Sequence, residues 1–399
     1  MFKKDCFLCG SRKLKKILDL GMQPWCNDFS KNKVVKKYPL SLNYCLDCSN
    51  VQISYVIDKK KMFLDHKYLS GTNYELIKHF KKISKEIIKK FQKKSLSVLD
   101  LGSNDGSFLL NFKNKKNINI LGVESCKNIA RISLKNKIKT INKFFDYKLA
   151  LQINREFDCI HASGFFFHLQ NLKSVTKGIK HLLACDGIFI IEFLYMKKII
   201  EKNFFDQIYH EHLNYYNLQP LQSFLYSYDL EIFDAKSSPI HGGSLIVYVA
   251  HKGIKEKTKR YLSLLKTEQT LEVNNQDFYL NFQSAVDKRK IMFKQKISLL
   301  RDRGFNIYGV GAPAKASVFL NYCNISNKDL PNGTLENNYL KFNKFIPGTN
   351  IKIIDEKKIS KKIYNKKDIF LILSWNFKNS IIKKYKKKFG NNFKYFLPH

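Results

Sequence analysis

Residues 97–109 read SVLDLGSNDGSFL, and this stretch decides the fold of the chain. A strand-like apolar run ends at Leu101, and glycines follow at positions 102 and 106 before a helix-like segment. Glycines at the carboxyl end of a parallel strand let the backbone pass close to a bound ligand. Their spacing, G-x-N-x-G, differs from the G-x-G-x-x-G of dinucleotide-binding folds. The stretch therefore predicts a ligand-binding loop in an α/β fold.

Strand-like and helix-like segments alternate between residues 96 and 193, as a parallel sheet with crossover helices requires. The second strand, INILGVES at residues 118–125, ends in Glu124, whose carboxylate can accept hydrogen bonds from two ribose hydroxyls. Later strands follow in FDCIHAS (157–163) and LLACDGIFIIEF (182–193). An acidic residue after the second strand, combined with a glycine loop after the first, is typical of S-adenosylmethionine-dependent methyltransferases.

Four of the nine cysteines form two pairs with the same spacing, CFLC at residues 6–9 and CLDC at residues 45–48. Two C-x-x-C pairs can place four thiolates around a tetrahedral zinc ion, each pair on a tight turn. A thioredoxin-like role needs only one such pair, beside a βαβ unit, and four reduced thiols without a metal are the other alternative. We predict a structural zinc site, because four protein ligands leave no open position for chemistry.

The last third of the chain repeats the pattern of the centre. After a charged helical connector at residues 255–300, the stretch GFNIYGVGAPAKASVFL (304–320) has the order strand, glycine turn and helix, which predicts a second Rossmann-like domain. Amides from Gly311 to Ala314, together with Lys315, can hold a diphosphate at the start of this helix. A purely structural turn is the alternative interpretation.

We therefore expect an α/β chain of three domains. A zinc-binding N-terminal domain is predicted at residues 1–72, a Rossmann-like class I methyltransferase domain at 73–254, and the connector with a Rossmann-like α/β domain at 255–399. The length of 399 residues is two to three times that of a typical domain of about 150 residues, which fits this division.

The formal charge of +38 raises the question of nucleic-acid binding. Only seven of the 71 cationic residues are arginine, and the lysines are spread along the chain, as on solvated helix faces. We therefore expect no nucleic-acid partner and an attraction for anionic ligands. No apolar run reaches the roughly 20 residues of a membrane helix, and residues 1–10 contain no signal-peptide-like run. A cytoplasmic protein without a membrane partner is expected.

Residues 205–217, FDQIYHEHLNYYN, concentrate histidine, glutamate and tyrosine in a few positions. In an extended segment His210 and His212 point to one face and Glu211 to the other. A zinc site fits poorly, because H-E-H lacks the four-residue spacing of H-E-x-x-H. We predict an acid/base role for this cluster. The isolated His79 is expected to be a solvated or core histidine, and His241, in HGGS, either reaches the site or braces a turn.

Further motifs follow in order: GMQPWCNDF (21–29), YPLSLNYC (38–45), HGGSLIVYV (241–249), IPGTNIKI (346–353) and LILSWN (371–376). With the cysteine pairs, the glycine loop and FDQIYHEHLNYYN, they make the chain resemble the three-domain sugar C-methyltransferases. These enzymes methylate carbon 3 of nucleotide-linked 4-keto-6-deoxysugars. The resemblance covers nearly the whole length. The chain departs from the family at Gly164, where an asparagine is usual, and this leaves the exact sugar open.

The resemblance implies roles for matching positions. A structural zinc ion is implied for Cys6, Cys9, Cys45 and Cys48. The implied S-adenosylmethionine site comprises Gly102, Asn104, Asp105, Gly106 and Glu124. Catalytic roles are implied for Tyr209, Glu211, His212 and, as a further tyrosine, Tyr68. His212 is the implied base, with His210 as the alternative, and we expect His241 and Lys315 to contact the substrate.

The expected reaction is methylation of carbon 3 of a nucleotide-linked 4-keto-deoxysugar through an enolate. Removing the carbon-3 proton requires a base, and the developing oxyanion requires a hydrogen-bond donor. An RNA-binding methyltransferase with a zinc module and a non-catalytic sugar-binding protein are the alternatives. Salt-dependent RNA binding would favour the first, and the intact YHEH beside an intact cofactor loop disfavours the second. The sequence does not fix the oligomeric state, and a monomer is compatible with it.

Overall fold

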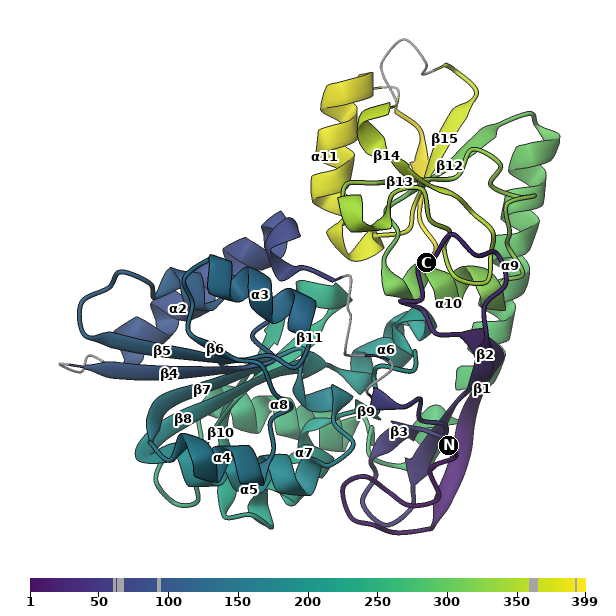
Figure 1. Ribbon diagram of the computed structural model, residues 1–399. Coiled ribbons are helices and arrows are strands. Elements are labelled where there is room, and N and C mark those ends of the chain that lie inside the picture. Colours follow the sequence, from purple (N-terminus) through teal and green to yellow (C-terminus); the bar gives the residue numbers. More distant parts are fainter. Residues whose placement is uncertain (60–61, 63–67, 92–94, 359–364, 392) are drawn as a thin grey trace. The chain divides into compact units, whose positions relative to one another are not determined.

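The computed structural model describes residues 1–59, 62, 68–91, 95–358, 365–391 and 393–399 (Figure 1). These residues form two compact units. Unit 1 contains residues 1–15, 43–198 and 211–279, and unit 2 contains residues 16–42, 199–210 and 280–399. The three consecutive domains expected from the sequence stay a prediction. Within the described part of the chain, no helix is both long enough and apolar enough to cross a membrane.

A seven-stranded sheet forms the centre of unit 1, in the order β10-β11-β8-β7-β4-β5-β6. Its strands are β4 (Leu96–Leu101), β5 (Ile118–Val123), β6 (Thr140–Ile141), β7 (Phe157–Ser163), β8 (Leu183–Leu194), β10 (Leu230–Ser238) and β11 (Ser244–His251). Strands β4 to β8 are parallel, and β11 is antiparallel to β8 and β10. The strand order reverses beside β4, and ligands bind at such a switch point in open α/β sheets.

Helices cover both faces of this sheet (Figure 1). One face carries α2 (Tyr74–Phe91) and α3 (Lys127–Lys135), and the other carries α4 (Tyr147–Ile153), α5 (Leu172–Leu182), α7 (Leu218–Tyr226) and α8 (Lys259–Thr270). Helix α2 buries Leu76, Phe80, Ile83 and Ile87, which recur at helical spacing and pack against the sheet. Burying each of these side chains contributes about 1.5–3 kcal/mol.

The segment after His212 pairs with the N-terminal part of unit 1. Strand β3 (Val51–Ile53) is antiparallel to β9 (Asn214–Tyr215) in a sheet of order β1-β2-β3-β9, where β1 is Leu14–Pro24 and β2 is Lys37–Cys45. Asn50 Nδ2 also donates a hydrogen bond of 3.1 Å to Asn214 Oδ1. These bonds tie the cysteine-containing turns to the histidine-rich segment.

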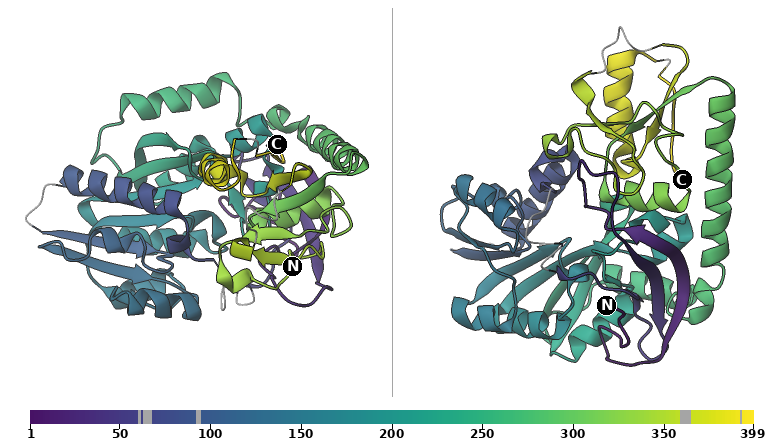
Figure 2. Two further views of the ribbon diagram at one scale, coloured as in Figure 1. Left: turned by 90° about the horizontal axis from the view of Figure 1, so that it is seen from above. Right: turned by 45° about the vertical axis from the view of Figure 1, so that its right-hand side comes forward.

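Unit 2 contains a five-stranded parallel sheet in the order β14-β13-β12-β15-β16. Its strands are β12 (Asn306–Val310), β13 (Thr334–Glu336), β14 (Ile353–Asp355), β15 (Asp368–Ile372) and β16 (Tyr395–Phe396). Its helices are α9 (Phe282–Asp302), α10 (Ala314–Tyr322) and α11 (Lys378–Phe389), and α9 is the long helix that flanks this sheet (Figure 2). The chain crosses from unit 1 to unit 2 within helix α6 (Met196–Lys202), between residues 198 and 199. The prediction of two Rossmann-like α/β regions is confirmed.

An ion pair fastens α8 to strand β10. Asp234 accepts hydrogen bonds from Arg260 Nε at 2.9 Å and from Thr258 Oγ1 at 2.6 Å. Burial by itself raises the pKa of the Asp234 carboxyl, but Arg260 and Thr258 outweigh burial and hold this pKa below its usual value. The stabilisation is therefore present above the unfolded-state pKa of about 3.9 and is lost as the pH falls through the folded-state pKa.

Replacing Asp234 tests this linkage. Asp234→Asn should lower the free energy of unfolding at pH 7 by about 1–2 kcal/mol, because Arg260 loses its charged partner. The loss stays this small because Arg260 is partly exposed and solvent screens the pair. Urea titrations followed by circular dichroism should show the difference between parent and variant shrinking toward pH 3. An equal difference at both pH values would contradict the assignment.

Candidate functional site

The four paired cysteines come together in unit 1. Their sulfur atoms all lie within 4.8 Å of one another. The Sγ atoms of Cys6 and Cys48 are 3.5 Å apart, and those of Cys9 and Cys45 are 3.6 Å apart. Tetrahedral zinc with Zn–S bonds of about 2.3 Å requires sulfurs about 3.8 Å apart. The cluster therefore fits a zinc ion with four thiolate ligands.

Both cysteine pairs lie on turns of the same geometry. The Gly10 amide donates to the Cys6 carbonyl at 3.0 Å, and the Ser49 amide donates to the Cys45 carbonyl at 2.9 Å. Gly10 and Ser49 occupy equivalent positions and have φ angles of 81° and 59°. The residue with left-handed backbone conformation closes each turn. The two sulfurs of each pair then lie close to those of the other pair. This local geometry explains why the C-x-x-C spacing identifies the site from sequence.

The glycine loop after β4 lies at the carboxyl end of the unit 1 sheet. Gly102 has a φ of 70°, and a Cβ atom added there would lie 2.8 Å from the ring of Phe165. The Gly106 amide closes the loop with a hydrogen bond of 3.0 Å to the Ser103 carbonyl. A side chain at position 102 would be strained by the backbone conformation and blocked by the ring. The loop needs glycine for both reasons.

Glu124, directly after β5, organises this loop. Its Oε2 accepts a hydrogen bond of 2.9 Å from the Asn104 amide, and its Oε1 accepts one of 2.7 Å from the Cys126 amide. The residue is 6% exposed. Two amides thus hold the carboxylate at the end of the second strand, where it was predicted to meet a ribose.

The segment before α2 is tied to the same loop. The Ser70 amide donates to Asn104 Oδ1 at 2.9 Å, and the Gly71 amide donates to Asp105 Oδ2 at 2.8 Å. Asn104 Nδ2 donates to the Tyr68 carbonyl at 3.3 Å. The structure therefore brings Tyr68, which is 38% exposed, beside the predicted cofactor loop.

The second half of YHEH lies with the short helix η3 (Phe166–His168). His168 Nδ1 donates a hydrogen bond to the Glu211 carbonyl, and the ring centroids of His168 and His212 are 5.1 Å apart. The Leu213 amide donates to the Phe167 carbonyl at 2.9 Å, and the Phe167 ring meets His212 edge-on at 4.7 Å. His212, 5% exposed, and Glu211, 3% exposed, are thus held beside the half-buried imidazole of His168, and the two rings form an imidazole cluster.

Electrostatics connects this cluster with the cofactor loop. The pKa of the Cys126 thiol is raised, first by burial, then by the charge of Glu124 and, more weakly, by that of Glu211. Cys126 follows Glu124 by two residues, so Glu211 lies within electrostatic reach of the cofactor loop.

The first half of YHEH belongs to unit 2. His210 is fully buried, its Nε2 lies 3.1 Å from the Pro39 carbonyl, and its ring meets Tyr38 edge-on at 5.9 Å. Tyr209 is half-buried in the same unit. The boundary between the compact units falls between His210 and Glu211. Neighbouring histidines of one motif therefore pack in different environments.

Lys315 is buried at the start of α10 in unit 2. Its Nζ donates to Asn376 Oδ1 at 2.8 Å and lies 3.6 Å from the centre of the Trp375 ring. Burial lowers the pKa of Lys315 to about 7, although the nearby Asp206 opposes the shift. In the preceding turn the Ala312 amide donates to Glu336 Oε2 at 2.8 Å. The Gly311 amide donates to the Leu335 carbonyl at 2.7 Å, and Pro313 has no N–H. The prediction that the amides from Gly311 to Ala314 hold a diphosphate is therefore wrong for the first three positions.

His241 lies in a strained turn of unit 1. It has a φ of 57°, which is uncommon for a residue other than glycine. Glu192 lies near the end of β8, and burial by itself raises the pKa of its carboxyl. His241 is one of the neighbouring groups that outweigh burial and lower this pKa.

The sequence reasoning did not include His168 and Glu192 among the site residues, and it treated His79 as an isolated histidine. The structure places His79 Nε2 2.8 Å from Glu192 Oε2. A glutamate inside the apolar run GIFIIEFL was the available signal for Glu192, because a buried strand rarely contains an unpartnered carboxylate. For His168 the available signal was its position just after the end of a parallel strand.

Comparison with known proteins matches three family models in order along the chain. They describe a zinc-binding domain at residues 6–63, a methyltransferase domain at 68–234 and a C-methyltransferase C-terminal domain at 239–398. The C-methyltransferase NovU of Streptomyces niveus is 23% identical over 99% of this chain and 95% of its own length.

Solved methyltransferase structures are also similar. An S-adenosylmethionine-dependent methyltransferase from Clostridium acetobutylicum is 16% identical, with a TM-score of 0.37 over 44% of this chain and 92% of its own. Magnesium protoporphyrin IX methyltransferase from Synechocystis, with bound SAM, is 11% identical, with a TM-score of 0.33 over 44% of this chain and 79% of its own.

The cysteine cluster, the cofactor loop and the matched domains define an S-adenosylmethionine-dependent C-methyltransferase with a zinc-binding domain. The three matches follow one another along the chain, from the zinc-binding model through the methyltransferase model to the C-methyltransferase C-terminal model.

Metal analysis tests the cysteine site. The purified protein should contain about one zinc ion per chain, and Cys6→Ser or Cys45→Ser should each lose it, because a closed set of four thiolates needs every ligand. Zinc can be measured by plasma mass spectrometry, with Cys185→Ser, an exposed cysteine outside the cluster, as the matched control. Full zinc retention in both ligand variants would overturn the assignment.

Calorimetry tests the role of Glu124. Glu124→Ala should weaken S-adenosylmethionine binding by about 1–3 kcal/mol, because the ribose hydroxyls and the Asn104 amide lose an acceptor. Glu156→Ala, at an exposed position, is the control. Unchanged affinity in the Glu124 variant would exclude this residue from the cofactor site.

Proposed function

We propose that the enzyme methylates carbon 3 of a nucleotide-linked 4-keto-deoxysugar and that His212 is the base. The observation that supports the proposal best is the contact between the half-buried imidazole of His168 and the buried imidazole of His212, whose ring centroids are 5.1 Å apart. NovU, which is similar over nearly the whole chain, is itself a C-methyltransferase.

The chemistry explains why such a pair is useful. A carbon next to a ketone becomes nucleophilic when its proton is removed, because the negative charge moves onto the ketone oxygen. Imidazole titrates near neutral pH and can accept this proton. S-adenosylmethionine supplies the methyl group, and the chain must hold the enolate carbon in line with it.

We assign proton abstraction to His212 instead of His210. His212 lies beside His168 in unit 1, whereas His210 faces the Pro39 carbonyl in unit 2. The bond from His168 Nδ1 to the Glu211 carbonyl fixes the His168 tautomer with a proton on Nδ1. His168 then supports the imidazole of His212 during proton transfer.

The remaining predicted residues receive supporting roles. The hydroxyls of Tyr68 and Tyr209 can donate to the enolate oxygen, and Glu211 can orient the imidazole of His212. On the substrate, His241 is assigned to the sugar and Lys315 to the nucleotide diphosphate. An anionic diphosphate would favour the charged form of Lys315, whose pKa is about 7 without it. The reaction is assigned to the cytoplasm.

Solvent exchange isolates proton abstraction from methyl transfer. His212→Asn should keep its fold and bind both ligands, yet slow hydrogen exchange at carbon 3 of the keto sugar in deuterium oxide by about 10²–10⁴-fold, the usual contribution of a general base. Mass spectrometry of the sugar, incubated without methyl donor, measures the exchange. His181→Asn, an exposed histidine on α5, should exchange at the parent rate.

Exchange at the parent rate in His212→Asn would reject His212 as the base and direct attention to His210 or Tyr68. The same incubations, supplied with S-adenosylmethionine and a panel of nucleotide-linked 4-keto sugars, would identify the sugar that gains a methyl group. No methylated product from any nucleotide-linked 4-keto sugar would overturn the proposed substrate class.

A further inference from the structure

A buried hydrogen bond between a histidine and a carboxylate joins α2 to the sheet at the carboxyl end of the parallel strands. His79 comes from the second turn of α2, and Glu192 lies near the end of β8. Their side chains are 10% and 2% exposed, and His79 Nε2 lies 2.8 Å from Glu192 Oε2. Much of the layer between α2 and the sheet is apolar. Burying a carboxylate there is costly, and such groups are concentrated at functional sites.

Glu192 also holds the end of the neighbouring strand, β7. Ser163 Oγ donates to Glu192 Oε2 at 2.9 Å, and the Gly164 amide donates to the Glu192 carbonyl at 3.2 Å. Burial by itself raises the pKa of Glu192, but His79, His241 and Ser163 outweigh burial and lower this pKa below its usual value. Glu192 is therefore an ionised hydrogen-bond acceptor at the point where β7 ends.

The residues that follow Ser163 lead directly to the imidazole cluster. Phe165 places its ring where a side chain at Gly102 would lie. The Phe165 carbonyl accepts a hydrogen bond of 3.0 Å from the His168 amide, and His168 Nδ1 donates to the Glu211 carbonyl. The short turn from Ser163 to His168 thus connects the His79–Glu192 hydrogen bond, the cofactor loop and the imidazole cluster of His168 and His212.

We infer that Glu192, held by His79, is a positioning residue that fixes the Ser163–His168 turn and, through it, the ring of His168 beside His212. The inference rests on the proposed function for its catalytic consequence. Its structural part concerns the geometry of His168 alone. A displacement of about 1 Å at such a turn can cost about 10²-fold in rate.

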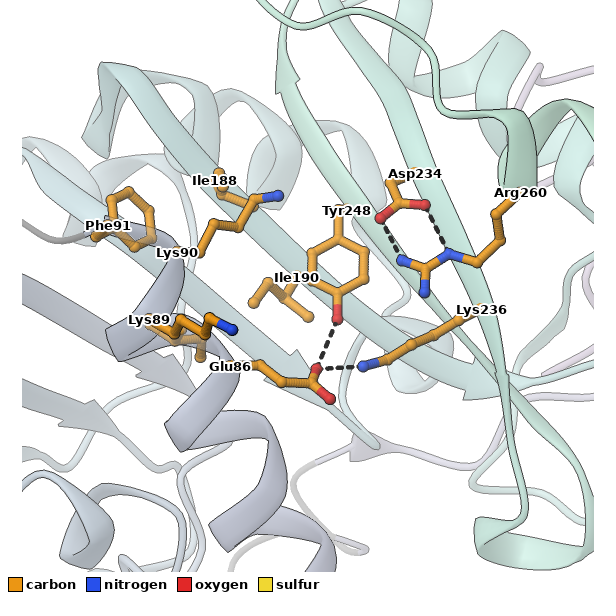
Figure 3. Close-up of a pocket in the computed structure, with 11 residues that line it drawn as sticks. Glu86, Lys89, Lys90, Phe91, Ile188, Ile190, Asp234, Lys236, Tyr248 and Arg260 are labelled. Carbon is orange, nitrogen blue, oxygen red and sulfur yellow. Dashed lines mark hydrogen bonds and ion pairs between the residues drawn. The ribbon is translucent and has the colours of Figure 1, made fainter.

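Helix α2 offers a matched control at its other end. Glu86 pairs with Lys236 and accepts a hydrogen bond of 3.3 Å from Tyr248 (Figure 3). These residues line a pocket with Ile188 and Ile190, which come from the middle of β8, and no residue of the Ser163–His168 turn lines it. Glu86→Gln therefore removes a second polar anchor between α2 and the sheet without touching the Ser163–His168 turn.

Two measurements test the inference on the full chain. In protein labelled with ¹⁵N-histidine, the Nδ1 proton of His168 should give a protected resonance, which His168→Asn assigns by removing it. Glu192→Gln should broaden or abolish this resonance, and Glu86→Gln should keep it. Ser163→Ala, which removes a single hydrogen bond, is the milder variant if Glu192→Gln folds poorly, and it should broaden the resonance partially.

The second measurement is carbon-3 exchange in a double-mutant cycle. Glu192→Gln should slow exchange about 10²-fold and add nothing further in the His168→Asn background, while the Kd for S-adenosylmethionine, measured by calorimetry, stays within about twofold of the parent value. An intact His168 resonance in Glu192→Gln, or additive losses in the cycle, would overturn the inference. If the parent enzyme exchanges no sugar, the proposed function fails, and the His168 resonance still decides the inference.

Discussion

The ring of Phe165 fills the space that a side chain at position 102 would need, and this close contact depends on a glycine at that position. The contact brings the turn after β7 against the loop after β4. Because β7 and β4 are the parallel strands beside the switch point, their two loops lie next to each other at the carboxyl end of the sheet. Glu124 accepts a hydrogen bond from the Asn104 amide in the loop after β4. Glu192 accepts one from Ser163 Oγ, where the turn after β7 begins. Two buried carboxylates thus determine the local geometry.

The zinc site supports the same region from the N-terminal side. Asn50, beside the second cysteine pair, donates to Asn214, which follows His212 by two residues. The antiparallel pairing of β3 with β9 adds backbone hydrogen bonds to this link. A closed four-thiolate site supplies folding free energy and no open coordination position. A zinc ion bound there would therefore stabilise the segment that contains His212.

Local patterns revealed much of the fold and part of the site. The cysteine pairs and the glycine loop are short motifs whose geometry is set within a few residues, so their spacing was sufficient. The pairing of His79 with Glu192 joins residues 113 positions apart, and it depends on how α2 is placed over the sheet. The environments of His210 and His212 could not be separated by alternation along a strand, because the boundary between the two units falls between them. Sequence alone contains no signal for such a boundary.

The interleaving of the two units has a consequence for protein engineering. Each unit is assembled from three separate stretches of the chain, and the stretch 199–210 belongs to unit 2 although unit 1 residues flank it on both sides. No single cut in the gene separates the units, so recombining halves of related enzymes would divide at least one core. Specificity in such a scaffold is more readily changed by substitutions at individual positions than by exchange of modules.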